Sequence, residues 1–215
     1  MILKVLSGIA LAATFLASAR PLVSQAVDEA EQSKAGFSLG AGFSDFDPDV
    51  TQNPLPDDVL HEGWGQGRMW GATVWADAGI PASAKWVRGF SIEAEYRTIF
   101  AGGSAGQSQI RESHLAGGAA YTWRQWDRVN PYVKYLFGYG AVSFPPEPET
   151  NGTTYSQDSR GINIVGAGAE VRCTGHLWVR AEYEYESWGE LLGPHLQPQG
   201  FTVGAMYHFR RSAQR

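Results

Sequence analysis

Three residues that could together form a hydrolytic centre stand side by side at Glu112, Ser113 and His114. A carboxylate, a hydroxyl and an imidazole are the groups that activate a serine for nucleophilic attack, for example on an ester of a lipid. The surrounding sequence predicts a β-strand, in which neighbouring side chains point to opposite faces. Ser113 and His114 would then not form a direct hydrogen bond, so we expect no catalytic site here.

The spacing of the other histidines, the cysteine and the glycine-rich segment indicates neither a metal site nor a phosphate site. His61, His176, His195 and His208 show no metal-ligand spacing, and the single cysteine, Cys173, excludes an intrachain disulfide and a Cys-based metal site. The glycine-rich segment 102–106 lacks the lysine and helix of a phosphate-binding loop. We therefore expect no cofactor and no metal.

The first long connection is acidic and leaves one alternative open. Its carboxylates could hold divalent cations that bridge surface lipid, but their spacing matches no calcium loop, so we expect a solvated acidic loop. These carboxylates are Asp45, Asp47, Asp49, Asp57, Asp58 and Glu62.

A larger set of charged residues recurs at every second position of apolar segments. In one segment Phe90, Ile92, Ala94 and Tyr96 alternate with polar residues, which is typical of a strand with two different faces. The polar faces mix both signs, so we predict ion pairs across a narrow interior. The predicted interior network comprises Glu93, Glu95, Arg97, Lys134, Glu170, Arg172, Arg180, Glu182 and Glu184, with Glu112 and Glu186 on the same polar faces.

The same alternation predicts about eight strands of roughly ten to thirteen residues. A tilted strand needs roughly 9 to 11 residues to cross a bilayer, whereas strands of soluble proteins are usually about 5 to 6 residues long. The predicted strands lie near 37–44, 67–77, 90–97, 110–123, 131–143, 161–172, 177–186 and 201–209. Long connections are expected at 46–66, 99–109, 144–160 and 188–199, and short ones at 78–86, 124–130 and 173–176.

Aromatic residues are expected near the ends of the apolar faces, where rings favour the boundary between lipid and water. They are Tyr96, Tyr121, Trp123, Tyr132, Tyr183, Tyr185 and Tyr207. The fold class predicted is all-β: a closed, antiparallel, up-and-down transmembrane β-barrel of about eight strands, with both termini on the periplasmic side. A soluble barrel would also alternate, but it would explain neither the strand length nor the aromatic ends. Eight strands leave room only for side chains, so we predict a salt-bridged plug, the alternative being a proton or ion path.

The N-terminus predicts export. Residues 1–26 combine Lys4, an apolar run and small residues at two candidate cleavage sites, after Ala19 or Ala26, and so resemble a signal peptide. A membrane anchor is the alternative, but the run is shorter than a spanning helix needs. An N-terminal segment follows at 27–34. Because the leader holds two bases and no acid, the rest of the chain carries a charge of about −7, which argues against a nucleic-acid partner.

The last strand carries a family resemblance. Gly204, Tyr207 and Phe209 stand in a pattern that resembles the terminal signal read by the outer-membrane barrel assembly machinery, followed by a short polar tail at 210–215. Over residues 35–209 the chain resembles the small OmpA-like eight-stranded outer-membrane barrels. The resemblance implies a monomer in the outer membrane of a Gram-negative-type bacterium, with outer-membrane lipid and the assembly machinery as partners. It also implies a non-enzymatic structural or surface-interaction role. A lipid-modifying barrel enzyme and a soluble periplasmic ligand-binding barrel remain the alternatives.

Overall fold

All eight expected strands are present in the computed structural model. It describes residues 36–48, 68–80, 87, 89–101, 110–124, 126, 128–148, 154–189 and 196–209. The strands are β1 (Phe37–Asp47), β2 (Met69–Gly79), β3 (Phe90–Ala101), β4 (Ile110–Thr122), β5 (Val129–Pro148), β6 (Thr154–Arg172), β7 (Leu177–Trp188) and β8 (Gln199–Phe209). Among the described residues, no helix has the length and hydropathy needed to cross a bilayer. The predictions for 1–34, for the middle of the acidic loop and for 210–215 lie outside the described residues.

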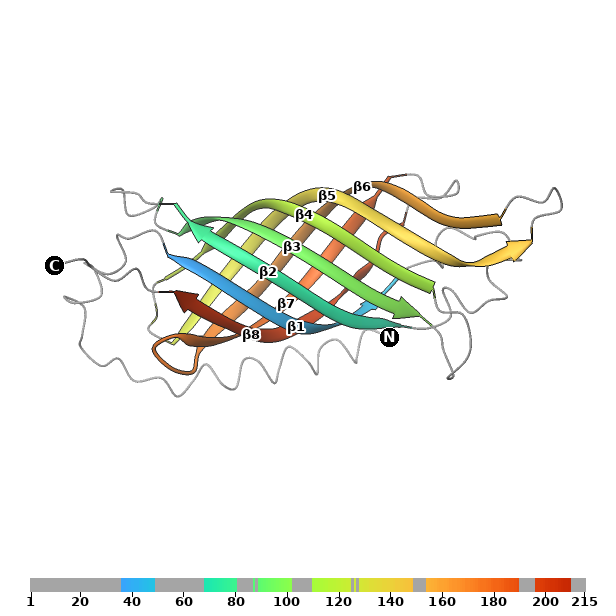
Figure 1. Ribbon diagram of the computed structural model, residues 1–215. Helices are drawn as coiled ribbons and strands as arrows, with labels where there is room; N and C mark the ends of the chain where they lie inside the picture. The colour runs from blue at the N-terminus through green and yellow to red at the C-terminus, as the bar shows by residue number, and fades with distance from the viewer. Residues whose placement is uncertain are drawn as a thin grey trace, which may run out of the picture. The chain divides into compact units, whose positions relative to one another are not determined.

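Each strand pairs with its neighbours in sequence, and the first pairs with the last, so the sheet closes into a barrel (Figure 1). Every pairing is antiparallel, and β1 meets β8 in a continuous register from Phe37 opposite Phe209 to Asp47 opposite Gln199. The predicted closed, up-and-down topology is therefore confirmed. The start of β1 and the end of β8 lie at the same end of the barrel, which we call the terminal end.

The connection predicted at 144–160 is wrong at both of its boundaries. β5 continues to Pro148 and β6 begins at Thr154, so most of this segment is a paired hairpin that extends β5 and β6 (Figure 1). Pro145 and Pro146 suggested a loop because proline cannot donate to a strand ladder. The pairing instead shifts register between Ser143 and Glu147, and such an irregularity lets a ladder continue past residues that cannot pair.

The outward face of the barrel is apolar. Leu115, Phe137 and Tyr139 are each about two-thirds exposed, and large apolar side chains from all eight strands are exposed in the same way. Exposed apolar surface on this scale is typical of a face that contacts the hydrocarbon of a bilayer. One aromatic was assigned to the wrong face. Tyr132 is only 2% exposed and points inward, because it lies two residues from the inward Lys134, whereas the neighbouring Val133 points outward.

The interior holds an apolar cluster that the alternation did not predict. These buried side chains, 0–4% exposed, come from strands β1 to β7 and from the residue three positions before β8. We call them the apolar layer: Phe46, Met69, Ile99, Ile110, Ala116, Leu136, Val142, Ile162, Ile164, Trp188 and Leu196. Several stand at strand ends far from the terminal end, such as Phe46 near the end of β1 and Met69 at the start of β2.

Two interior tryptophans fit against glycines. A Cβ on Gly140 would lie 2.2 Å from Trp188 Cη2, and a Cβ on Gly40 would lie 2.3 Å from Trp75 Cε2. Both distances are far below van der Waals contact. A side chain at either position would therefore displace an indole from the interior.

Candidate functional site

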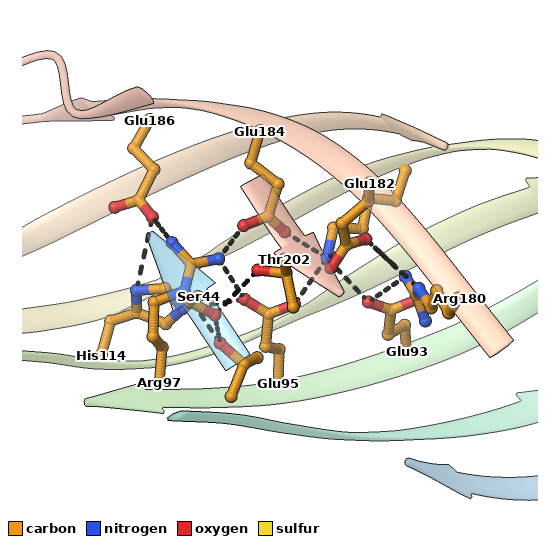
Figure 2. A network of polar contacts seen from close by, with 12 residues as sticks. Ser44, Glu93, Glu95, Arg97, His114, Arg180, Glu182, Glu184, Glu186 and Thr202 are labelled. Atoms are coloured by element: carbon orange, nitrogen blue, oxygen red, sulfur yellow. Dashed lines mark hydrogen bonds and ion pairs between the residues drawn. The ribbon is translucent and has the colours of Figure 1, made fainter. Parts of the chain in front are cut away.

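The charged side chains of β3 and β7 meet in the middle of the barrel. Glu93, Glu95 and Arg97 alternate along β3, and Arg180, Glu182, Glu184 and Glu186 alternate along β7, so period two places each set on the inward face. All seven are at most 3% exposed. Figure 2 shows the three glutamates of β7 in a row facing the charged residues of β3.

Lys134 of β5 is the cation at the centre of this network. Its Nζ lies 2.5 Å from Glu95 Oε2, 3.1 Å from Glu93 Oε1 and 3.1 Å from Glu182 Oε2, and it also pairs with Glu184. Oxygens of Glu95, Glu182 and Glu184 lie within 4.8 Å of one another, a spacing that could hold a metal ion. Because the Lys134 ammonium lies within bonding distance of all three carboxylates, we interpret it as a tethered cation that takes the place of an ion.

Arg180 organises the part of the network nearest the terminal end. Its Nη2 donates to Glu93 and to Glu182 at 2.9–3.0 Å, and its Nε donates to the Tyr132 hydroxyl at 2.5 Å. The Tyr132 hydroxyl in turn donates to Glu182. The guanidinium lies 4.3 Å from the centre of the Tyr132 ring and 5.0 Å from that of Trp75, at cation–π distance.

Arg97 connects the network to the apolar layer. It pairs with Glu95 at 2.9 Å and with Glu184 and Glu186, and its guanidinium lies 3.8 Å from the centre of the Phe46 ring. Trp188 Nε1 donates to Glu186 Oε2 at 2.7 Å, so Trp188 belongs to the apolar layer and also contacts the charged network.

Hydroxyl groups complete the polar interior. Ser44 contacts Thr73 at 2.5 Å and Thr202 at 2.8 Å, and Arg97 Nε donates to Thr73 at 3.1 Å. These side-chain bonds connect β1, β2, β3 and β8 in addition to the backbone hydrogen bonds of the sheet.

Two of the nine residues predicted for the network lie apart from it. Glu170 is 8% exposed but forms no hydrogen bond and no ion pair within 4 Å to any residue that the structure describes. Arg172 is partly exposed at the end of β6, and its Nε donates to the Thr174 carbonyl at 3.3 Å. The structure brings the other seven together and adds Asp77, His114, Tyr132 and Glu186. Residues 132 and 134 are two apart on one strand, so strand alternation alone would have placed the Tyr132 side chain on the inward face with Lys134.

The hydrolytic candidates separate as the alternation predicts. Glu112 and His114 are 1% and 2% exposed and face the interior, whereas Ser113 lies on the outward face. His114 Nε2 lies 3.1 Å from Glu95 Oε1, so the imidazole belongs to the charged network. Neither carboxylate oxygen of Glu112 has a hydrogen-bond partner among the described residues.

The described interior holds more acids than bases. Apart from Asp158, which pairs with Arg160 at 2.6 Å, eight carboxylates face Arg97, Lys134, Arg180 and the imidazoles of His114 and His208. These acids are Asp77, Glu93, Glu95, Glu112, Glu170, Glu182, Glu184 and Glu186. Unpaired charge is costly away from water, so the excess requires protons or bound cations.

The residues of the predicted assembly signal lie on both faces of β8. Tyr207 and Phe209 are 45% and 46% exposed on the outward face, with ring centres 4.9 Å apart. Phe209 also lies 5.6 Å from the ring of Phe37 on β1. Gly204 lies where a Cβ would be 2.3 Å from the Ala41 carbonyl oxygen, so a residue without a side chain fits the seam between β1 and β8.

Solved structures share this fold. The chain superposes on Neisserial surface protein A with a TM-score of 0.56 and 12% identity, covering 81% of this chain and 97% of that one. A major outer membrane protein of Thermus thermophilus gives 0.52 and 12%, covering 82% and 100%. Ail, the attachment invasion locus protein of Yersinia pestis, gives 0.50 and 16%, covering 81% and 97%.

Family membership rests on the sequence as well as on the fold. No curated protein matches the chain. The family model of the outer membrane protein beta-barrel domain matches residues 9–209, nearly the whole chain. The chain therefore belongs to the outer membrane protein beta-barrel domain family.

Proposed function

We propose that this protein is a non-enzymatic, non-conducting outer-membrane barrel, which anchors in the bilayer and presents its loops at the cell surface. The observation that carries the proposal is the filled interior. Salt bridges cross the lumen from β3 to β5 and β7, and the apolar layer lies beside them. An eight-stranded barrel has little space beyond its side chains, so these two regions together would leave no continuous path for ions.

The direction of insertion follows from the two ends of the barrel. The terminal end carries the turn between β6 and β7, which is only four residues long, whereas the opposite end carries the extended β5–β6 hairpin. In outer-membrane barrels the short turns face the periplasm and the longer connections face outward. The terminal end would then be periplasmic and the hairpin would be displayed outside.

The proposed partners are the lipid of the outer membrane and, during biogenesis, the barrel assembly machinery. The outward side chains make an apolar surface around the barrel, and rings such as Trp123, Tyr183 and Tyr207 lie on it. With this surface covered by lipid, a single chain has no unpaired sheet edge along the closed barrel, so a monomer is sufficient.

The two alternative functions fit the arrangement less well. A lipid-modifying enzyme would need a nucleophile beside a base, but Ser113 faces outward while His114 is held inside against Glu95. A soluble ligand-binding barrel would need an outward face that water can solvate, and this face is apolar.

An epitope placed between Asn151 and Gly152 tests the proposed role at the surface. We expect antibody to label intact cells through this epitope, and an epitope joined to Arg215 to be labelled only after the outer membrane is opened. A matched insertion at Gly175, in the β6–β7 turn, should behave like the C-terminal epitope. Recovery of the protein in the soluble fraction, or labelling of the Gly175 epitope in intact cells, would overturn the proposal.

A further inference from the structure

A small pocket lies inside the barrel, between its terminal end and the charged network. Its volume is about 40 Å³, enough for a few water molecules. Polar groups from six strands line it, among them Ser38, Asp77, Ser91, Thr122, Glu170 and His208. Tyr132 and Glu93 also line it, and Glu93 Oε1 lies 3.1 Å from Lys134 Nζ.

Glu170 lines this pocket without a hydrogen bond or an ion pair within 4 Å to a described residue. The residue is 8% exposed. His208 Nε2, also in the pocket lining, is buried without a hydrogen-bond partner among the described residues. A carboxylate that is removed from bulk water and unpaired is costly, unless a ligand in the pocket compensates it.

Two arginines stand near the pocket, and the charge of one of them, Arg180, is already shared. Arg180 Nη1 lies 3.6 Å from Asp77 Oδ2, but the same guanidinium also pairs with Glu93 and Glu182. Asp77 accepts a hydrogen bond from Ser38 at 3.2 Å, which brings no charge. Arg124 lines the pocket from the exposed segment after β4, and both arginines attract Glu170 without forming an ion pair with it within 4 Å. The lining holds three carboxylates, of Asp77, Glu93 and Glu170, against one arginine, so acids are in excess at this end too.

We propose that this pocket binds a hydrated divalent cation, with Glu170 as its principal ligand and Asp77 as its second. Oxygen ligands are those that Mg²⁺ and Ca²⁺ prefer. Among the described residues only Glu95, Glu182 and Glu184 converge within 4.8 Å as a set of three, so an ion here contacts fewer carboxylates and keeps several waters. The small volume excludes polyamines and other organic cations as fully enclosed ligands.

The test uses Tb³⁺ as a probe for the site, with the detergent-folded barrel and excitation of its aromatic residues. Tyr132 lines the pocket and can sensitise a bound lanthanide. We expect luminescence that excess Mg²⁺ or Ca²⁺ displaces, and a loss of affinity of at least tenfold in Glu170→Gln. Asp158→Asn is the matched control, because Asp158 is a buried acid on the same strand that already pairs with Arg160.

A second readout is the melting temperature. In a chelator Glu170→Gln should melt at the same or a higher temperature than the wild type, because it removes an unpaired charge. Added Mg²⁺ should raise the melting temperature of the wild type and of Asp158→Asn but not that of Glu170→Gln. Asp77→Asn, which keeps Glu170, should show an intermediate response. Equal Tb³⁺ affinity in wild type and Glu170→Gln, or no displaceable binding at all, would overturn the proposal and leave protons to balance the excess acids.

Discussion

Lys134 Nζ lies 2.5 Å from Glu95 Oε2 in the centre of the barrel, and both side chains are completely buried. Four carboxylates share this one ammonium. Removing it would leave several buried negative charges without compensation, whereas removing a partner from an exposed pair leaves a charge that water solvates.

Lys134→Met should therefore destabilise the barrel by about 3 to 5 kcal/mol. The matched control is Arg68→Met, which breaks the exposed pair of Arg68 and Asp45 and should cost less than about 1 kcal/mol. Urea unfolding in lipid vesicles measures both values. Similar losses for the two variants would contradict the assignment of Lys134 to the interior.

The pair Glu93 and Arg180 predicts a charge-exchange result. Glu93→Arg alone and Arg180→Glu alone each place like charges together, so each should lower the melting temperature strongly. The double exchange restores opposite charges across the 2.9 Å contact and should recover part of the loss. Thermal melts of the four proteins measure the coupling, and simple additivity of the two losses would show that the residues do not interact.

The interior glycines predict a packing effect that depends on position. Gly140→Ala would place a Cβ 2.2 Å from Trp188 and should cost about 1 to 3 kcal/mol, with a change in tryptophan near-ultraviolet circular dichroism. Gly161→Ala on the neighbouring strand is the control, because a Cβ there meets nothing within 4 Å. A spectrum of Gly140→Ala identical to that of the wild type would exclude this contact.

The last strand predicts a kinetic effect without a matching loss of stability. If Phe209 is part of an assembly signal, Phe209→Ala should slow folding by the assembly machinery. Phe201→Ala removes a ring of similar exposure from the same strand and should not slow folding. The rate at which the heat-modifiable folded form appears in reconstituted membranes measures this, and equal rates for the two variants would assign Phe209 to lipid contact alone.

The sequence predicted the strands and the inward charges because both depend on local alternation. Once Glu93 and Arg97 face inward, every second residue of β3 must do so as well. Tyr132 was misassigned because aromatic character was given more weight than its parity with Lys134. The apolar layer was missed because Phe46, Ile99 and Leu196 become neighbours only when the sheet closes, and Glu170 was grouped with ion pairs because pairing depends on distances across the lumen.

Single-channel recording in planar bilayers tests the closed interior most directly. Folded wild-type protein should give no discrete conductance steps under conditions in which a diffusion porin, inserted at the same density, conducts. The double variant Lys134→Met, Trp188→Ala disturbs the charged network and the apolar layer at once. If its heat-modifiable migration shows that it still folds, it should give conductance steps that neither single variant shows. Reproducible steps from the wild-type monomer would contradict the account.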